Sequence, residues 1–69
     1  MANHVYKHIE LTGSSPESYQ KAIENAVTRA SKTVRNMRWF EVIDRRGHIE
    51  NNQVSNWQAT IKIGFTMED

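Results

Sequence analysis

The chain has 69 residues and a formal net charge of +1, with nine basic and eight acidic side chains. This length holds one domain, expected over residues 1–69, and the near balance of charge provides no general attraction to nucleic acid. No cysteine is present, which excludes disulfides and thiolate metal sites. Since a domain this small buries only about 60% of the surface of its unfolded chain, association between subunits is the expected source of further burial.

The sequence also lacks the marks of a membrane or secreted protein. No apolar run approaches the roughly 20 residues of a membrane span, and the N-terminal residues MANHVYKHIE lack the basic and apolar regions of a signal peptide. A cytoplasmic protein without a membrane partner is therefore predicted.

The first predicted element is a strand over residues 4–12, HVYKHIELT, in which apolar and polar side chains alternate. Ile9 and Leu11 share one face of this strand, whereas Tyr6 and His8 share the other. Such alternation is typical of a strand that is buried on one side only.

A helix is predicted next, with Ser15 as N-cap, Pro16 in the first helical position and Glu17 near the positive end of the helix dipole. Apolar residues then recur at steps of three and four over about five turns, which indicates an amphipathic helix. The apolar stripe comprises Tyr19, Ala22, Ile23, Ala26, Val27, Ala30 and Val34.

Two further strands are predicted over residues 37–49 and 54–67, joined by the polar turn ENNQ as an antiparallel hairpin. Gly47 interrupts the first of them and indicates a bulge or bend nearby. The expected fold class is α+β in the order β-α-β-β, with one helix covering one face of a small sheet. Whether the first strand pairs with the second or with the third is left open by the pattern.

Adjacent residues of a strand point to opposite faces, so Trp39 and Phe40 cannot share one core. Because the apolar face of the last strand is expected to meet the helix, Phe40 is predicted to pack in the core and Trp39 to face away from it. Three interpretations of Trp39 are a subunit interface, a platform for a flat ligand, and incidental exposure. Its expected neighbours on that face are Tyr6, His8, Glu41, Ile43, Gln58, Thr60 and Lys62.

Four segments of the chain resemble the dodecins, a family of small flavin-binding proteins: VYKHIELTGSSPES, AIENAVTRASKTVRNMRWFEV, RRGHI and WQATIKIGF. The resemblance covers nearly the whole chain. It implies a three-stranded antiparallel sheet wrapped around one helix, and twelve such subunits in a hollow homododecamer. It also implies that FMN or riboflavin, with FAD as a further candidate, binds as stacked pairs between two symmetry-related tryptophans.

The same resemblance assigns the residues of the flavin site. Trp39 corresponds to the stacking tryptophan, and Gln58 to the glutamine that meets the edge of the isoalloxazine ring. Arg46 corresponds to a residue near the pocket, although strict alternation places it on the face of Phe40 unless a bulge near Gly47 shifts it. Arg45, whose position matches Trp39 in the alternation, is the competing candidate, and no metal ligand is assigned.

The predicted function is flavin storage and buffering, in which stacking on Trp39 lets an excited flavin decay by electron transfer to the indole. An enzyme is not expected, because no nucleophile motif is evident and His4 and His8 lie about 13 Å apart along one strand. One alternative is a nucleic-acid-binding module, since aromatic side chains on a sheet can stack bases, but the balanced charge argues against it. Another is a purely structural oligomeric module.

Overall fold

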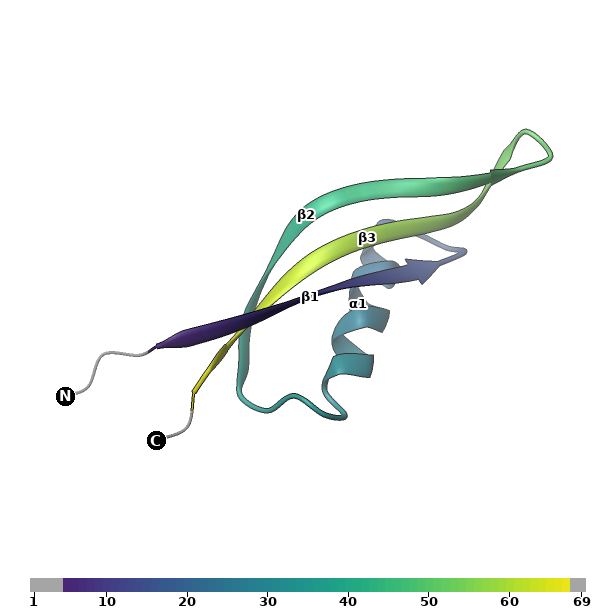
Figure 1. The fold of residues 1–69 in the computed structure, drawn as a ribbon. Coiled ribbons are helices and arrows are strands. Elements are labelled where there is room, and N and C mark those ends of the chain that lie inside the picture. The colour runs from purple at the N-terminus through teal and green to yellow at the C-terminus, as the bar shows by residue number, and fades with distance from the viewer. Residues whose placement is uncertain (1–4, 68–69) are drawn as a thin grey trace.

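The computed structural model describes residues 5–67 and contains three strands and one helix in the order β-α-β-β (Figure 1). The elements are β1 (Tyr6–Ser15), α1 (Tyr19–Ala30), β2 (Met37–Glu50) and β3 (Gln53–Thr66). β3 is the central strand and pairs antiparallel with both β1 and β2. The predicted fold class is confirmed, and the first strand pairs with the third. His4, the first residue of the predicted first strand, lies outside the described residues.

The helix is shorter than predicted at both ends. Its N-cap is Ser18, whose side chain accepts a hydrogen bond from the backbone N–H of Lys21 at 3.1 Å. Ser15 instead ends β1, where its hydroxyl oxygen accepts from the N–H of Glu17 at 2.9 Å. Both serines satisfy backbone donors, so the sequence offered two caps and the later one begins the helix. The helix ends at Ala30, and a turn then leads to Asn36, whose φ of 64° redirects the chain into β2.

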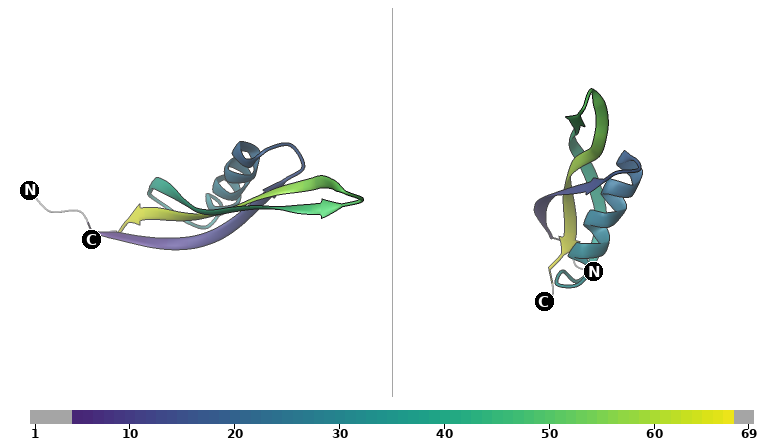
Figure 2. Two further views of the ribbon diagram at one scale, coloured as in Figure 1. Left: turned by 90° about the horizontal axis from the view of Figure 1, so that it is seen from above. Right: turned by 90° about the vertical axis from the view of Figure 1, so that its right-hand side faces the viewer.

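The core lies between α1 and the side of the sheet that faces it (Figure 2). Small helical side chains let the two approach closely: a Cβ at Gly13 of β1 would lie only 2.1 Å from the carbonyl oxygen of Ala22. The helix therefore sits directly on β1 and, beside it, β3. The buried apolar residues are Ala22, Ala26, Ala30, Ala59, Ile61 and Ile63.

The prediction that Phe40 packs in the core of the subunit is wrong. Phe40 pairs with Ile63, so it does lie on the helix side of the sheet, but it is 51% exposed. One helix is about 10 Å wide and strands are about 4.8 Å apart, so α1 covers mainly β1 and β3 and meets β2 only near its start, at Met37. Phe40 and Val42 thus form an exposed strip on β2. Phe40 also lines a hollow of about 240 Å³ together with Val27 and Met37.

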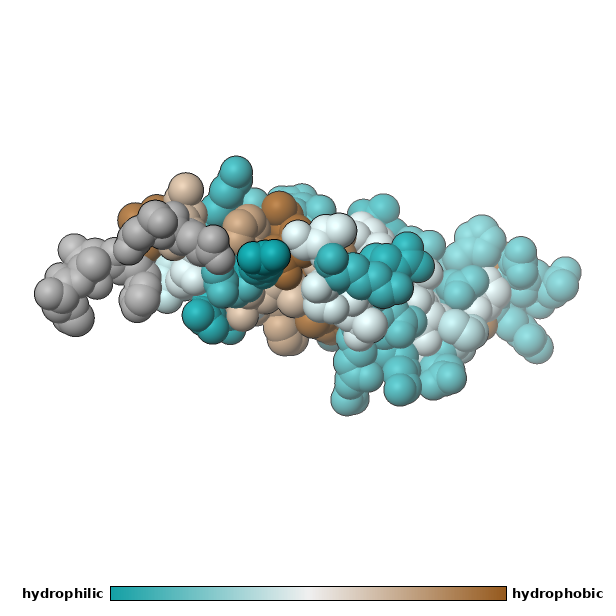
Figure 3. Space-filling model, turned by 90° about the horizontal axis from the view of Figure 1, so that it is seen from below, coloured by the Kyte–Doolittle hydropathy of each residue, from teal (hydrophilic) through white to brown (hydrophobic). Residues whose placement is uncertain are grey.

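The subunit is elongated, with extents of 55 × 21 × 13 Å. Its radius of gyration is 14.4 Å, whereas a compact domain of this length has about 11 Å. The end of the β2–β3 hairpin extends beyond β1, and it turns at Asn51 and Asn52, both with positive φ, as two-residue hairpins prefer (Figure 1). Figure 3 shows hydrophilic side chains over this hairpin end and apolar ones gathered over the middle of the molecule.

No helix within residues 5–67 has the length and apolar character needed to cross a membrane.

Candidate functional site

The face of the sheet turned away from α1, here called the outer face, carries the residues that the sequence singled out. Antiparallel register places directly opposed residues on the same face, about 5 Å apart. The rows of the outer face, each in the order β1, β3, β2, are His8, Gly64 and Trp39; Glu10, Lys62 and Glu41; Thr12, Thr60 and Asp44; and Ser14, Gln58 and Arg46.

Trp39 lies on the outer face, as predicted, and its indole rests on the central strand. It is paired with Gly64, and an ideal Cβ built on that glycine would lie 2.1 Å from Cε2 and Cζ2 of the indole. Tyr6 meets the indole edge-on, with ring centroids 6.2 Å apart and an angle of 60° between the planes. Trp39 is still 39% exposed, so the strand covers part of the indole and leaves the rest accessible for stacking.

Gln58 and Arg46 are direct cross-strand partners on the outer face. The irregularity that brings Arg46 to this face lies between Val42 and Asp44, where Ile43 has no partner in the register. The hypothesis that a bulge near Gly47 turns Arg46 is therefore wrong. A register irregularity does lie near Gly47, between His48 and Ile49, as the sequence indicated, but it comes after Arg46 along the strand. The register does place Arg46 and Gln58 on one face, as expected from the sequence.

Arg45 points to the opposite side of the sheet. It pairs with Ala59, a core residue, and its guanidinium lies 5.6 Å from the ring centroid of Tyr19. Tyr19 in turn meets Trp57 edge-on at 5.0 Å. Arg45 thus belongs to an aromatic cluster at the start of α1, and of the two arginine candidates only Arg46 shares the outer face with Trp39 and Gln58.

Asp44 is a member of the outer face that sequence reasoning missed. Its carboxylate accepts a hydrogen bond from the guanidinium of Arg46, two residues further along the strand. This bond and the positive charge of Arg46 lower the pKa of the Asp44 carboxyl below its usual value, so it is ionised at neutral pH. The signal in the sequence was the spacing of two between opposite charges, which puts both on one strand face.

The outer face brings Gln58 and Arg46 together but separates both from Trp39. The indole rests on Gly64, and β3 runs about 20 Å from Gln58 to Gly64 at about 3.3 Å per residue. A flat ring that stacks on the indole is therefore centred far along the strand from the carboxamide of the same subunit.

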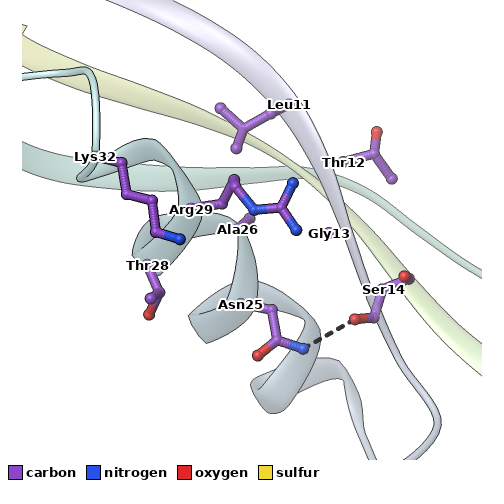
Figure 4. Close-up of a pocket in the computed structure, with 9 residues that line it drawn as sticks. All are labelled: Leu11, Thr12, Gly13, Ser14, Asn25, Ala26, Thr28, Arg29 and Lys32. Atoms are coloured by element: carbon purple, nitrogen blue, oxygen red, sulfur yellow. Dashed lines mark hydrogen bonds between the residues drawn. The ribbon is translucent and has the colours of Figure 1, made fainter.

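A separate groove of about 600 Å³ lies between β1 and α1 (Figure 4). Across it, the Asn25 side chain donates a hydrogen bond to the carbonyl oxygen of Ser14 at 3.0 Å, and Arg29 and Lys32 supply positive charge. None of the residues that line it is aromatic, so this groove offers no stacking surface, and it contains none of the predicted site residues.

Among the described residues 5–67, no group of three or more histidine, aspartate or glutamate side chains is arranged to hold a metal ion.

Comparison with known proteins gives consistent matches over nearly the whole chain. A family model described as Dodecin matches residues 5–68. The dodecin of Thermus thermophilus is 43% identical over 65 residues, which is 94% of each chain. The structure of dodecin from Streptomyces coelicolor aligns with a TM-score of 0.94 and 49% identity, covering 100% of this chain and 99% of that one. The calcium dodecin of Mycobacterium tuberculosis is 30% identical over 63 residues, 91% of this chain and 89% of its own.

Proposed function

This chain belongs to the dodecin family, and we propose on that premise that it binds, stores and buffers flavin, taking FMN or riboflavin and, as a further candidate, FAD. The observation that carries the proposal is the indole of Trp39, which lies over Gly64 on the outer face and is still 39% exposed. Isoalloxazine is a large, flat, electron-poor ring, and indole is electron-rich. Offset stacking of two such rings contributes about 0.5–1.5 kcal/mol beyond the burial of area.

The second part of the proposal is the assembly, a hollow homododecamer in which each site needs two subunits. Each copy offers one partly exposed indole, so a two-fold contact would bring two indoles together around a stacked pair of flavins. Gln58 lies about 20 Å along β3 from Gly64, on which the Trp39 indole rests. This distance favours a partner copy as the source of the glutamine that meets the flavin ring. The elongated subunit and the exposed strip of Phe40 and Val42 favour extensive contact between copies.

The polar groups of the outer face suit the rest of the ligand. The pyrimidine edge of a flavin alternates carbonyl and N–H groups, and the carboxamide of Gln58 has both a donor and an acceptor to match them. The guanidinium of Arg46 can serve a ribityl hydroxyl or a phosphate. Asp44 holds that guanidinium on the outer face, so less side-chain freedom is lost when a ligand binds.

The proposed site limits the photochemical reactions of bound flavin and catalyses no reaction. Direct stacking on Trp39 lets an excited flavin accept an electron from the indole. Rapid transfer of that electron back to the oxidised indole returns both groups to their ground states, which limits photochemical side reactions. No substrate is converted in this scheme, so the proposed role is that of a binding protein.

Two observations weigh against the other ligands. The net charge of +1 provides no general attraction to nucleic acid. The name of the M. tuberculosis relative indicates calcium for that protein, but residues 5–67 of a single subunit of this chain hold no cluster of metal-ligating side chains. Flavin is therefore the ligand that the outer face favours.

Titration of the purified protein with riboflavin, FMN and FAD tests the proposal. We expect saturable quenching of flavin fluorescence, with one flavin for each subunit. Riboflavin affinity is expected to change little with salt, whereas binding to phosphate backbones weakens steeply. Absence of quenching with all three flavins would overturn the proposal, and salt-sensitive binding of a single-stranded oligonucleotide instead would favour the nucleic-acid alternative.

Gln58→Ala is expected to weaken flavin binding by about 1–3 kcal/mol, because the buried pyrimidine edge would lose its partner. Calorimetry with riboflavin measures the change, and native mass spectrometry checks that the assembly is retained. Gln53→Ala is the matched control, since Gln53 is an exposed glutamine at the hairpin end of the same strand. Equal affinities of the Gln58 and Gln53 variants would remove Gln58 from the site.

Arg46→Ala is expected to weaken FMN binding more than riboflavin binding, by about 1.5–3 kcal/mol if the guanidinium bonds the phosphate. The matched control is Arg45→Ala, which removes a neighbouring arginine from the helix side of the sheet. We expect that variant to keep its affinity for both flavins. The reverse pattern in calorimetry would show that Arg45, and not Arg46, faces the ligand.

A further inference from the structure

Gly64 occupies the point of the outer face where a side chain would collide with the indole of Trp39. An ideal Cβ on Gly64 would lie 2.1 Å from Cε2 and Cζ2 and 2.6 Å from Nε1, distances that real Cβ atoms do not adopt. The neighbouring outer-face positions on β3, Lys62 and Thr66, both carry side chains. Gly64 is therefore a local gap in the outer face, and the indole fills it.

The backbone does not itself require glycine at this position. None of the described glycines has a positive φ, so an alanine at Gly64 would meet no conformational penalty from the backbone. Glycine in the interior of a strand is otherwise unfavourable, because it gains no packing and loses more conformational freedom on folding. The reason for glycine must therefore be the group that lies over it.

We propose that Gly64 is a positioning residue that sets the height of the Trp39 indole above the sheet. The inference rests on the proposed function, because that height determines where the exposed part of the indole meets a flavin. Gly64 forms the floor of the seat, and Tyr6 on β1 lies at the edge of the indole, at 6.2 Å between ring centroids. Because Gly64 lies beneath the indole and Tyr6 lies beside it, these two contacts fix the orientation in which the indole faces a ligand.

A methyl group at Gly64 would force the indole to rise or turn. Ordinary van der Waals contact needs at least about 3.4 Å between carbon atoms, well beyond the 2.1 Å available at Cε2 and Cζ2. The two walls of a stacked flavin pair would then no longer be correctly spaced. Gly64→Ala is thus expected to impair binding by displacing the Trp39 indole, without replacing any side chain that contacts the ligand.

A double-mutant cycle in ligand-free protein tests the seat itself. We expect Gly64→Ala to lower the melting temperature by about 4–8 °C when Trp39 is present, and to have little effect in a Trp39→Ala background, where nothing is displaced. Gly47→Ala is the matched control, because its Cβ would meet Asn56 and Val54 rather than Trp39, so its effect should be the same in both backgrounds. Equal losses for Gly64→Ala in the two backgrounds would overturn the inference.

The Gly64→Ala variant alone could fail to fold. In that case, recovery of folding when Trp39→Ala is added supports the inference, and failure of the double variant to fold overturns it.

Flavin binding and tryptophan emission test the positioning role. Gly64→Ala is expected to lower riboflavin affinity at least tenfold, and wild-type affinity would overturn that role. In a Trp57→Phe background, Trp39 is the sole tryptophan, and its quenching by acrylamide in ligand-free protein should rise with Gly64→Ala as the indole leaves its seat. A wild-type protein that binds no flavin would overturn the proposed function instead, while the melting cycle and acrylamide quenching would still decide whether Gly64 seats the indole.

Discussion

Replacing Trp39 by alanine is expected to lower flavin affinity by more than about 2 kcal/mol, or about thirtyfold in Kd. The variant loses both the stacking energy and the apolar area that the indole covers. Its fold should persist, because Trp39 lies on the outer face and not among the buried residues between α1 and the sheet. Any flavin still bound should be more fluorescent, since the electron donor is gone. Fluorescence titration with riboflavin, together with circular dichroism, measures both effects.

Trp57→Phe is the control for the Trp39 experiment. Trp57 lies on the helix side of the sheet against Tyr19, so its loss removes an indole without touching the outer face. Riboflavin affinity and quenching should be unchanged in that variant. Quenching that survives Trp39→Ala but disappears in Trp57→Phe would show that the flavin stacks on the other side of the sheet.

Phe40→Glu is expected to break the assembly. In the subunit this side chain is 51% exposed beside Val42, and the proposed assembly would bury it against another copy. An uncompensated charge in such a contact costs about 3–5 kcal/mol, and a symmetric shell repeats that cost in every copy. Native mass spectrometry at micromolar concentration should find a dodecamer for the wild type and smaller species for the variant, with a lower melting temperature.

Phe40→Leu provides the matched control, because it keeps an apolar side chain of similar size at the same place. We expect it to form the wild-type assembly. A wild-type protein that remains a monomer would contradict the dodecamer and, with it, a flavin site made by two subunits. A dodecamer of the Phe40→Glu variant would show instead that the strip on β2 faces solvent in the shell.

Alternation and helical periodicity predicted the number, type and order of the elements, because each depends on residues close together in the chain. The faces of Trp39 and Gln58 followed from the same local rule, and the register bears them out. The helix start was misplaced because Ser15 and Ser18 can both cap, and local pattern does not rank them.

Features that depend on contacts distant in sequence could not be predicted in the same way. The bulge at Ile43 carries no glycine to mark it, yet it decides which of Arg45 and Arg46 reaches the outer face. The exposure of Phe40 depends on how many strands one helix covers, which alternation alone does not reveal. The seat of Trp39 on Gly64 needs the register of β2 against β3.

The central place of β3 also determines the order in which the sheet can be completed. Tyr6 pairs with Thr66 and Ser15 with Trp57, so the first strand to be synthesised has no partner until the last one has been made. The hairpin of β2 and β3 closes across a two-residue turn, whereas β1 must close a loop that contains nearly all the rest of the chain, at a larger entropic cost. A chain released before β3 has been synthesised would therefore contain α1, β1 and β2 but no central strand. Its two strands would have unpaired edges that are open to aggregation.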